Sequence, residues 1–335
     1  MERIHLDLKV PRGWQQCSTR ELEMIAEEMI RSQMNASLSR FHPFDWTEIK
    51  TRLFFRLSGV EVIDAQTSGP DIDAASQSDA QTGSVTSFRC RKDNLEFDLQ
   101  TWQVHSFIDQ LKWLDATDAN GGPRPMPKLM WPYPERLWRW QWRRWMPAKA
   151  YYRPGELLDG MTWQQYRWIN DWMEVYTNTA NALIAEREKH AKADHERIRE
   201  LTVQQAGARM EVLAQLFCVG DNAAPSKAKP APRRLLRKIT DVEWQVVLIW
   251  WSSMMQYLKE QYPKCFKSGG RPSRQKQQAL PIELYTRSTA TLQKYLGGLT
   301  EAEINAQTAH AILRHLNDMA VEAEEMEKLR SKHKR

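Results

Sequence analysis

The sequence predicts a mainly α-helical protein, in which a small N-terminal α+β unit is followed by a helical region with long insertions. Three observations support this fold class. Apolar residues recur at helical spacing through most of the 335 residues. Several of these stripes begin with Ser or Thr followed three residues later by Glu or Gln, the capping box of a helix N-terminus. Alternating apolar residues, which are typical of strands, occur mainly in the N-terminal third.

The N-terminal α+β unit is expected to span residues 1–120. Ser18 and Glu21 form its clearest capping box, ahead of the stripe Leu22, Ile25, Ala26, Met29 and Ile30. The turn sequence RKDN lies between two short alternating segments and predicts a hairpin. The expected elements are a strand over 4–10, helices starting at Ser18 and Asp45, a hairpin over 85–99 and a helix over 104–114.

The remainder of the chain is expected to be helical. Charge rises after Asn181 while the apolar stripe thins, which predicts one long, largely solvated helix that regains an apolar face at Met210, Leu213 and Phe217. The polar stretch 67–84 predicts a loosely held loop. Further capping boxes are Thr162 with Gln165, Thr240 with Glu243 and Thr300 with Glu303. The first precedes an apolar face of Tyr166, Ile169, Met173 and Tyr176, and the last is expected to begin a single final helix. The expected segments are a Pro/Trp/Arg-rich connector (121–160), a helical segment with the long charged helix (161–220), a Pro/Ala/Lys-rich linker (221–240) and a C-terminal helical region (241–335).

Composition is that of a soluble globular protein, with 41% hydrophobic and 27% charged residues and a net charge of +6. No apolar run approaches the length of a membrane span, and the N-terminal residues do not resemble a signal peptide. The expected location is the cytoplasm. The four cysteines are far apart, which predicts reduced thiols and no zinc site: Cys17, Cys90, Cys218 and Cys265.

No motif in the sequence predicts catalysis, a cofactor or a metal. His195-Glu196 begins like the zinc motif HExxH, but Arg199 stands where the second histidine is needed. Histidines spaced five apart do not share a helix face, so the pairs 190/195 and 310/315 are expected to be surface residues. The basic segment SGGRPSRQ (268–275) lacks the GK[ST] of a phosphate loop. The protein is therefore expected not to be an enzyme.

The most unusual stretch is WPYPERLWRWQWRRWMP, residues 131–147, which holds five of the fifteen tryptophans. Its aromatic residues fit both helical and strand spacing, so periodicity does not decide its structure. Three interpretations remain open. The tryptophans pack into the protein body under arginine stems, they stack on the bases of single-stranded nucleic acid, or they anchor the chain at a membrane surface.

Five stretches share a hydrophobic pattern and a few aromatic residues with a known group of proteins: LKVPRGWQQCSTRELEMIAEEMI, TRLFFRLSGVEVI, FRCRKDNLEFDLQTWQVHSFIDQLKWLD, EWQVVLIWWSSMMQYLKEQYPKCFKSGG and HAILRHLNDMAVEAEEM. Together they resemble phage and prophage proteins of Bacteroidetes, a group identified with tail morphogenesis and with tail assembly chaperones in particular. The resemblance carries no catalytic signature. This chain departs from the group in the 131–147 run, the 67–84 loop and the long charged helix. The resemblance implies a location in the cytoplasm of a bacterial host cell, with association to the virion as an alternative.

The resemblance implies a non-catalytic helical protein that binds another tail protein during assembly, such as a tape-measure protein. Amphipathic helices joined by Pro/Ala linkers suit a chaperone that shields an apolar client. The candidate contacts are Trp138, Trp142, Trp145, Trp250, Trp251, Arg139 and Arg143. The alternative is a nucleic-acid-binding protein of a mobile element, which would use Arg136, Arg139, Arg143, Arg144, Arg233, Arg234, Arg237 and Lys238.

Overall fold

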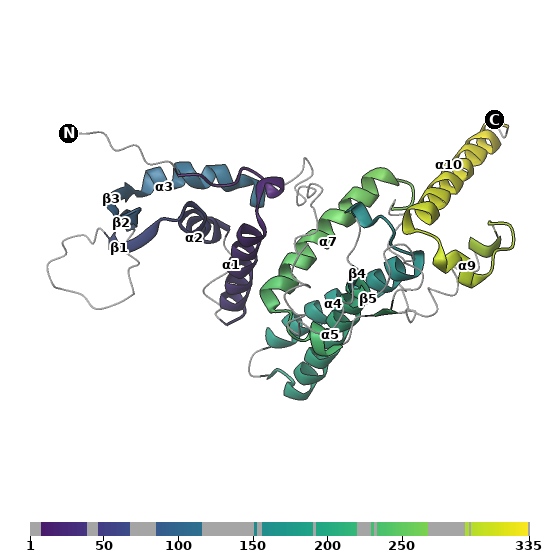
Figure 1. The fold of residues 1–335 in the computed structure, drawn as a ribbon, viewed down its shortest axis with the longest axis horizontal. Helices are drawn as coiled ribbons and strands as arrows, with labels where there is room; N and C mark the ends of the chain where they lie inside the picture. Colours follow the sequence, from purple (N-terminus) through teal and green to yellow (C-terminus); the bar gives the residue numbers. More distant parts are fainter. Residues whose placement is uncertain are drawn as a thin grey trace, which may run out of the picture. The chain divides into compact units, whose positions relative to one another are not determined.

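The computed structural model is mainly helical and includes a small antiparallel sheet, as the sequence predicted. The chain forms two compact units (Figure 1). Unit 1 comprises residues 1–129 and 241–249, and unit 2 comprises residues 130–240 and 250–335. None of the helices described is both long and apolar enough to span a membrane. The structure describes residues 8–38, 46–67, 85–115, 151–152, 156–189, 192–219, 229–230, 233–266, 292–294 and 296–333.

Unit 1 combines helices with a three-stranded sheet in the order β1-β2-β3. Residues 8–10, the described part of the predicted first strand, have no regular secondary structure. The predicted helix over 104–114 divides into an α-helix and a 3-10 helix. The elements of unit 1 are η1 (Trp14–Gln16), α1 (Thr19–Leu38), α2 (Trp46–Ser58), β1 (Glu61–Thr67), β2 (Val85–Lys92), β3 (Leu95–Gln100), α3 (Thr101–Ile108) and η2 (Asp109–Leu114).

The predicted hairpin is confirmed and its turn is short. Lys92 of β2 is paired directly with Leu95 of β3, which leaves a two-residue connection. The connecting residues, Asp93 and Asn94, have φ angles of 51° and 65°. This left-handed pair matches the twist of the flanking strands, and Asp and Asn adopt it at low cost. The sequence did not predict β1, which pairs with β2 and completes the sheet.

One face of the sheet packs against helices and the other carries charge. Phe88 of β2 contacts Phe55 of α2 at a centroid distance of 5.2 Å, and Cys90 on the same face is fully buried. On the opposite face the Glu96 carboxylate pairs with Arg89 at 2.9 Å and with Arg91 at 2.7 Å. The alternation therefore follows the ordinary rule for a half-buried antiparallel sheet.

The helices α1 and α2 are joined by a buried carboxylate. The predicted Ser18–Glu21 capping box is confirmed, because the Glu21 N–H donates to Ser18 Oγ at 3.3 Å and the Ser18 N–H donates to Glu21 Oε2 at 2.6 Å. Further along α1, Glu28 has no exposed surface. Its carboxylate lies 2.7 Å from Arg56 Nη1 and 3.4 Å from Arg52 Nε, both on α2. These charge-assisted contacts fix the two helices against each other.

Unit 2 is built mainly from packed helices. Residues 229–230 and 233–236, inside the predicted linker, form a short strand and a short helix. The C-terminal part of α7 also belongs to this unit. The elements are β4 (Tyr151–Tyr152), η4 (Glu156–Leu158), α4 (Trp163–Arg187), α5 (His195–Leu216), β5 (Cys218–Val219), β6 (Lys229–Pro230), α6 (Arg233–Leu236), α7 (Asp241–Gln261), α9 (Glu301–Ala306) and α10 (Ala309–His333).

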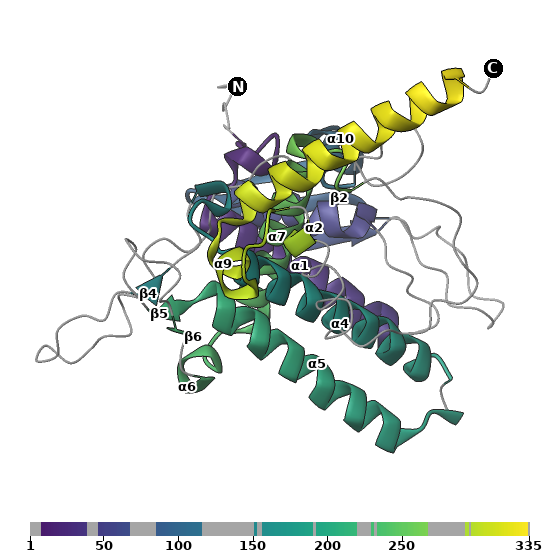
Figure 2. The same cartoon turned by 90° about the vertical axis from the view of Figure 1, so that its right-hand side faces the viewer.

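The prediction of one long charged helix is wrong, because the chain forms a helical hairpin there. Figure 2 shows α4 and α5 lying side by side. Asp194 caps α5 by accepting hydrogen bonds from the Glu196 and Arg197 N–H groups at 3.0 and 3.1 Å. The Glu186 carboxylate at the end of α4 accepts from the Asp194 N–H at 3.0 Å. These bonds stabilise the turn, and the sparse apolar stripes of the two helices then bury each other, including Leu183, Leu201 and Ala208.

The prediction of a single final helix is also wrong, because the chain is extended between α9 and α10. Gln307 has φ −66° and ψ 158°. Its carbonyl accepts from the Trp163 N–H at 2.7 Å, and the Ala309 N–H donates to the Met161 carbonyl at 2.9 Å. The break thus lets residues 307–309 pair with the residues just before α4. The capping boxes Thr162–Gln165 and Thr300–Glu303 are both confirmed.

Aromatic side chains form much of the interior of unit 2. Tyr166 lies 5.5 Å from Trp163 and 6.3 Å from Trp251, measured between ring centroids. Burial raises the pKa of the Tyr166 phenol to about 12. The predicted apolar stripe of α4 is confirmed where Tyr166, Ile169 and Met173 are buried. The helix α7 begins at Asp241, one residue after the predicted cap Thr240.

Candidate functional site

The residues predicted to contact a partner fall into two groups: those outside the described part of the chain and those that the structure shows to be buried. The 131–147 run lies outside the described residues, and so do Trp138, Trp142, Trp145, Arg139 and Arg143. Trp250 and Trp251 are described, and they are only 2% and 5% exposed. Their ring centroids lie 5.9 Å apart, and Trp251 also contacts Tyr166. The expectation that these two residues reach a partner does not fit this burial, because both occupy the core.

A pair of tryptophans on α4 is a better candidate for surface binding. Trp168 is 41% exposed and Trp172 is half-buried, with their ring centroids 6.2 Å apart. They stand four residues apart on the helix, next to the buried stripe. Burial raises the pKa of the neighbouring Asp171, and Glu174 raises it further, while the Arg167 charge opposes both effects. The pair therefore presents a large aromatic surface bordered by charge, a combination found at protein-binding hot spots.

Sequence reasoning missed this pair, although a signal was present. The buried stripe of α4 was assigned correctly through Tyr166, Ile169 and Met173. Trp168 and Trp172 fall beside that stripe, at positions where a solvated helix ordinarily carries polar residues. Two tryptophans at helical spacing on such positions indicate a contact beyond the helix itself.

Unit 1 has exposed apolar side chains of its own. Trp102, at the start of α3, is 70% exposed. Three aliphatic side chains on the sheet are also exposed: Val62 and Ile63 on β1, and Leu95 beside the hairpin turn. The ladder is irregular between Val62 and Asp64, so Ile63 has no direct partner on β2. Unit 1 therefore has a solitary exposed tryptophan, in contrast to the tryptophan pair of unit 2.

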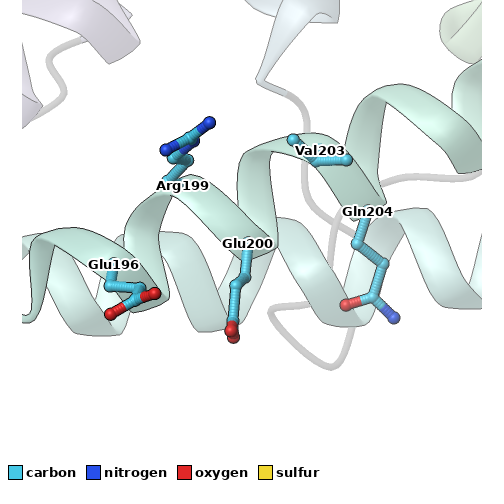
Figure 3. A pocket seen from close by; sticks show the side chains of 5 residues that line it. All are labelled: Glu196, Arg199, Glu200, Val203 and Gln204. Atoms are coloured by element: carbon cyan, nitrogen blue, oxygen red, sulfur yellow. The ribbon is translucent and has the colours of Figure 1, made fainter.

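A shallow hollow runs along α5 and has a single wall. Its lining residues all come from this helix, as Figure 3 shows: Glu196, Arg199, Glu200, Val203 and Gln204. Their spacing of three and four residues places them on one helix face. Ligand sites ordinarily surround most of a small molecule with apolar walls, whereas this surface is open and three of its five lining residues are charged. It is better suited to contact with another helix than to enclosing a metabolite.

His310 was predicted to be a surface residue, but both nitrogens of its ring have hydrogen-bond partners. Its Nε2 lies 2.8 Å from the Leu157 carbonyl and its Nδ1 lies 2.9 Å from the Tyr262 hydroxyl. Because a carbonyl only accepts, Nε2 carries the proton, and in the neutral ring Nδ1 accepts from Tyr262. The contact holds Leu157 and Leu158, which have φ angles of 56° and 67°. The prediction of a surface residue is wrong for His310, since these bonds brace a strained turn, while His195 and His315 are exposed as expected.

Three of the cysteines, Cys17, Cys90 and Cys265, are poor nucleophiles. Burial raises the pKa of Cys17 to about 12, with a further rise from Glu21. Burial likewise raises the pKa of Cys90 and of Cys265 to about 11, helped by Asp98 and Asp318 respectively. These three thiols are therefore protonated near neutral pH. Among the described residues, no group of three or more His, Cys, Asp and Glu side chains could hold a metal ion.

Comparison with known proteins found no relative. No protein-family model, no curated protein and no solved structure matches the chain.

Proposed function

We propose that the protein is a non-catalytic tail-morphogenesis factor of a phage or prophage, which binds another tail protein during assembly. A tape-measure protein is the partner we favour, because an unassembled one would be an apolar client of the kind that such a factor shields. The proposal is supported by the resemblance of the sequence to such factors. Within the structure, the supporting observation is the tryptophan pair Trp168–Trp172 on α4.

The tryptophan pair suits a helical client for a physical reason. Two large rings side by side offer an apolar surface that loses little conformational entropy when a partner covers it. Charged side chains around such a surface set the orientation of the partner more than its affinity. An amphipathic client helix meets these requirements because it presents an apolar face with charges on either side.

The test is the capture of tail proteins by the full chain. Tagged protein is recovered from infected or prophage-induced cells at low and high salt, with and without nuclease, and bound proteins are identified by mass spectrometry. We expect a tail protein to remain through both treatments. The double variant W168A/W172A should lose most of it, because exposed tryptophans often supply a large share of the binding energy. W102A, which removes an exposed tryptophan from unit 1, is the matched control and should retain the partner.

A second function, binding of nucleic acid, is favoured by a different observation. Arg234 and Arg237 are exposed, on α6 and directly after it. Exposed arginines attract phosphates, and binding of that kind weakens steeply as salt rises. Recovery of nucleic acid that disappears at high salt, with no tail protein captured, would reject the assembly role. In that case the variant R234E/R237E should abolish the recovery while W168A/W172A leaves it intact.

A further inference from the structure

The C-terminal half of α10 carries an apolar stripe that extends out of the protein core. Its residues alternate spacings of four and three, as in a coiled coil: Ile312, Leu316, Met319, Ala323 and Met326. Exposure rises along the stripe. Ile312 is fully buried, Leu316 and Met319 are half-buried, and Met326 is 54% exposed. Leu329, one turn further on, is 52% exposed. The same stripe that packs into unit 2 at its start therefore continues into solvent.

The contacts of α10 with its own unit are concentrated in its first part. Cys265 Sγ donates to the Leu313 carbonyl at 3.2 Å, and the Lys264 N–H donates to Asn317 Oδ1 at 3.0 Å. Lys264 also forms an ion pair with Glu324. From Glu325 to Ser331, every side chain that the structure describes is exposed. Figures 1 and 2 both show this end of the helix extending away from α4, α5 and α9.

The charges along this half of α10 are separated by sign. An acidic block comes first, with Asp318, Glu322, Glu324, Glu325 and Glu327. A basic block follows, with Lys328, Arg330 and Lys332 on α10 and Lys334 and Arg335 after them in the sequence. Each block has five charges of one sign and none of the other. The segment is thus complementary to a reversed copy of itself, because an antiparallel neighbour would place its basic block beside the acidic block.

We propose that a second copy of this chain covers the exposed stripe, with the two α10 helices antiparallel. A two-fold axis near the boundary between the blocks brings Met326 of each copy close to Leu329 of the other and aligns opposite charges on both sides. A parallel pair would instead place like charges together. The contact is self-complementary, as a two-fold dimer requires. It does not depend on the proposed tail role.

The first experiment measures the mass of the full chain by sedimentation velocity across a wide concentration series. We expect reversible dimerisation that weakens at high salt, since exposed charges are screened. The variant K328E/R330E should raise the dimer dissociation constant by about tenfold or more, because like charges then face each other in both halves. The control R234E/R237E makes the same charge change on and beside α6 and should dimerise as the unaltered chain does.

A mixing experiment identifies the orientation. The variant E322K/E325K should also lose self-association, because its acidic block is nearly neutralised. An equal mixture of E322K/E325K with K328E/R330E should form a heterodimer, because the altered blocks are again opposite in sign. Circular dichroism of each variant reports whether α10 remains helical.

Three outcomes would overturn the proposal. A monomer at every concentration would mean that another part of the chain or another protein covers the stripe. Tighter self-association of K328E/R330E would indicate parallel helices. Dimerisation that survives M326E but is lost in V203E, a matched change at an exposed position of α5, would place the contact elsewhere.

Discussion

Units 1 and 2 hold their helices together by different chemistry. In unit 1, α1 and α2 are joined through the buried carboxylate of Glu28 and the guanidinium groups of α2. In unit 2, the corresponding role belongs to packed aromatic rings, including Tyr166 and Trp251. A buried charge tolerates little change in position because it must keep its partners, whereas apolar packing tolerates repacking at moderate cost. Unit 1 should therefore respond sharply to loss of one charge, and unit 2 to loss of volume.

The largest effect is expected in the aromatic core of unit 2. Replacing Trp251 by Ala removes a side chain that is only 5% exposed and leaves a cavity beside Tyr166. We expect a loss of about 3–5 kcal/mol in the free energy of unfolding of unit 2. The exposed Trp168 is the matched control, and W168A should cost about 1 kcal/mol. Urea unfolding followed by hydrogen exchange assigns the loss to its unit, and equal costs for the two variants would contradict this description of the core.

A somewhat smaller effect is expected from the buried carboxylate of unit 1. Glu28→Gln keeps the shape of the side chain but leaves the guanidinium groups of Arg52 and Arg56 without their central charge. We expect the free energy of unfolding of unit 1 to fall by about 3 kcal/mol. This is at the lower end of the range for a broken buried ion pair, because both guanidinium groups are partly exposed. Glu27 shares the partner Arg56 but is 43% exposed, so E27Q should cost below about 1 kcal/mol. Thermal unfolding of the two variants tests this difference, and a stable E28Q would show that unit 1 does not depend on the charge.

The smallest expected effect is the pH dependence of the stability of the turn between α4 and α5. This turn of unit 2 depends on a carboxylate, that of Glu186. The Asp194 N–H and the Lys189 ammonium hydrogen-bond to Glu186 and lower its pKa below the ordinary range. Because the pKa of Glu186 is lower in the folded state than in the unfolded state, its ionised carboxylate stabilises the turn at pH values above the unfolded-state pKa. This stabilisation is lost as the pH falls through the folded-state pKa. Hydrogen-exchange protection of the Asp194 amide should therefore decrease below about pH 4. E186Q should remove the pH dependence, whereas E188Q at an exposed neighbouring position should preserve it.

The features that the sequence predicted correctly are local. The Ser18, Thr162 and Thr300 capping boxes need only residues three positions apart, and the hairpin needs only its own turn. The features that were missed depend on distant partners. The strand β1 forms because β2 supplies a ladder, and residues 307–309 are extended because they pair with the residues before α4. No proline or glycine marks either of the two helix breaks, so the sequence carried no local signal there.

Candidate surface residues were harder to predict than secondary structure. Trp250, Trp251, Trp168 and Trp172 all lie in helical segments, and hydrophobicity alone does not separate them. The periodicity of α4 places Trp168 beside its buried stripe, so the exposure of that residue could have been predicted. The periodicity of α7 was less informative, because this helix is apolar on most of its circumference and its burial depends on the surrounding elements.

The strained turn at Leu157 and Leu158 gains its stabilising partner only late in synthesis. His310, which binds the Leu157 carbonyl, follows it by 153 residues. At ordinary translation rates of roughly 5–20 residues per second, His310 is made about 8–30 s after Leu157. During that interval neither the strained turn nor the start of α4 has the partner that holds it in the finished protein. Residues 307–309, which pair with the start of α4, are made in the same interval, so the last helix closes this part of unit 2 late in synthesis.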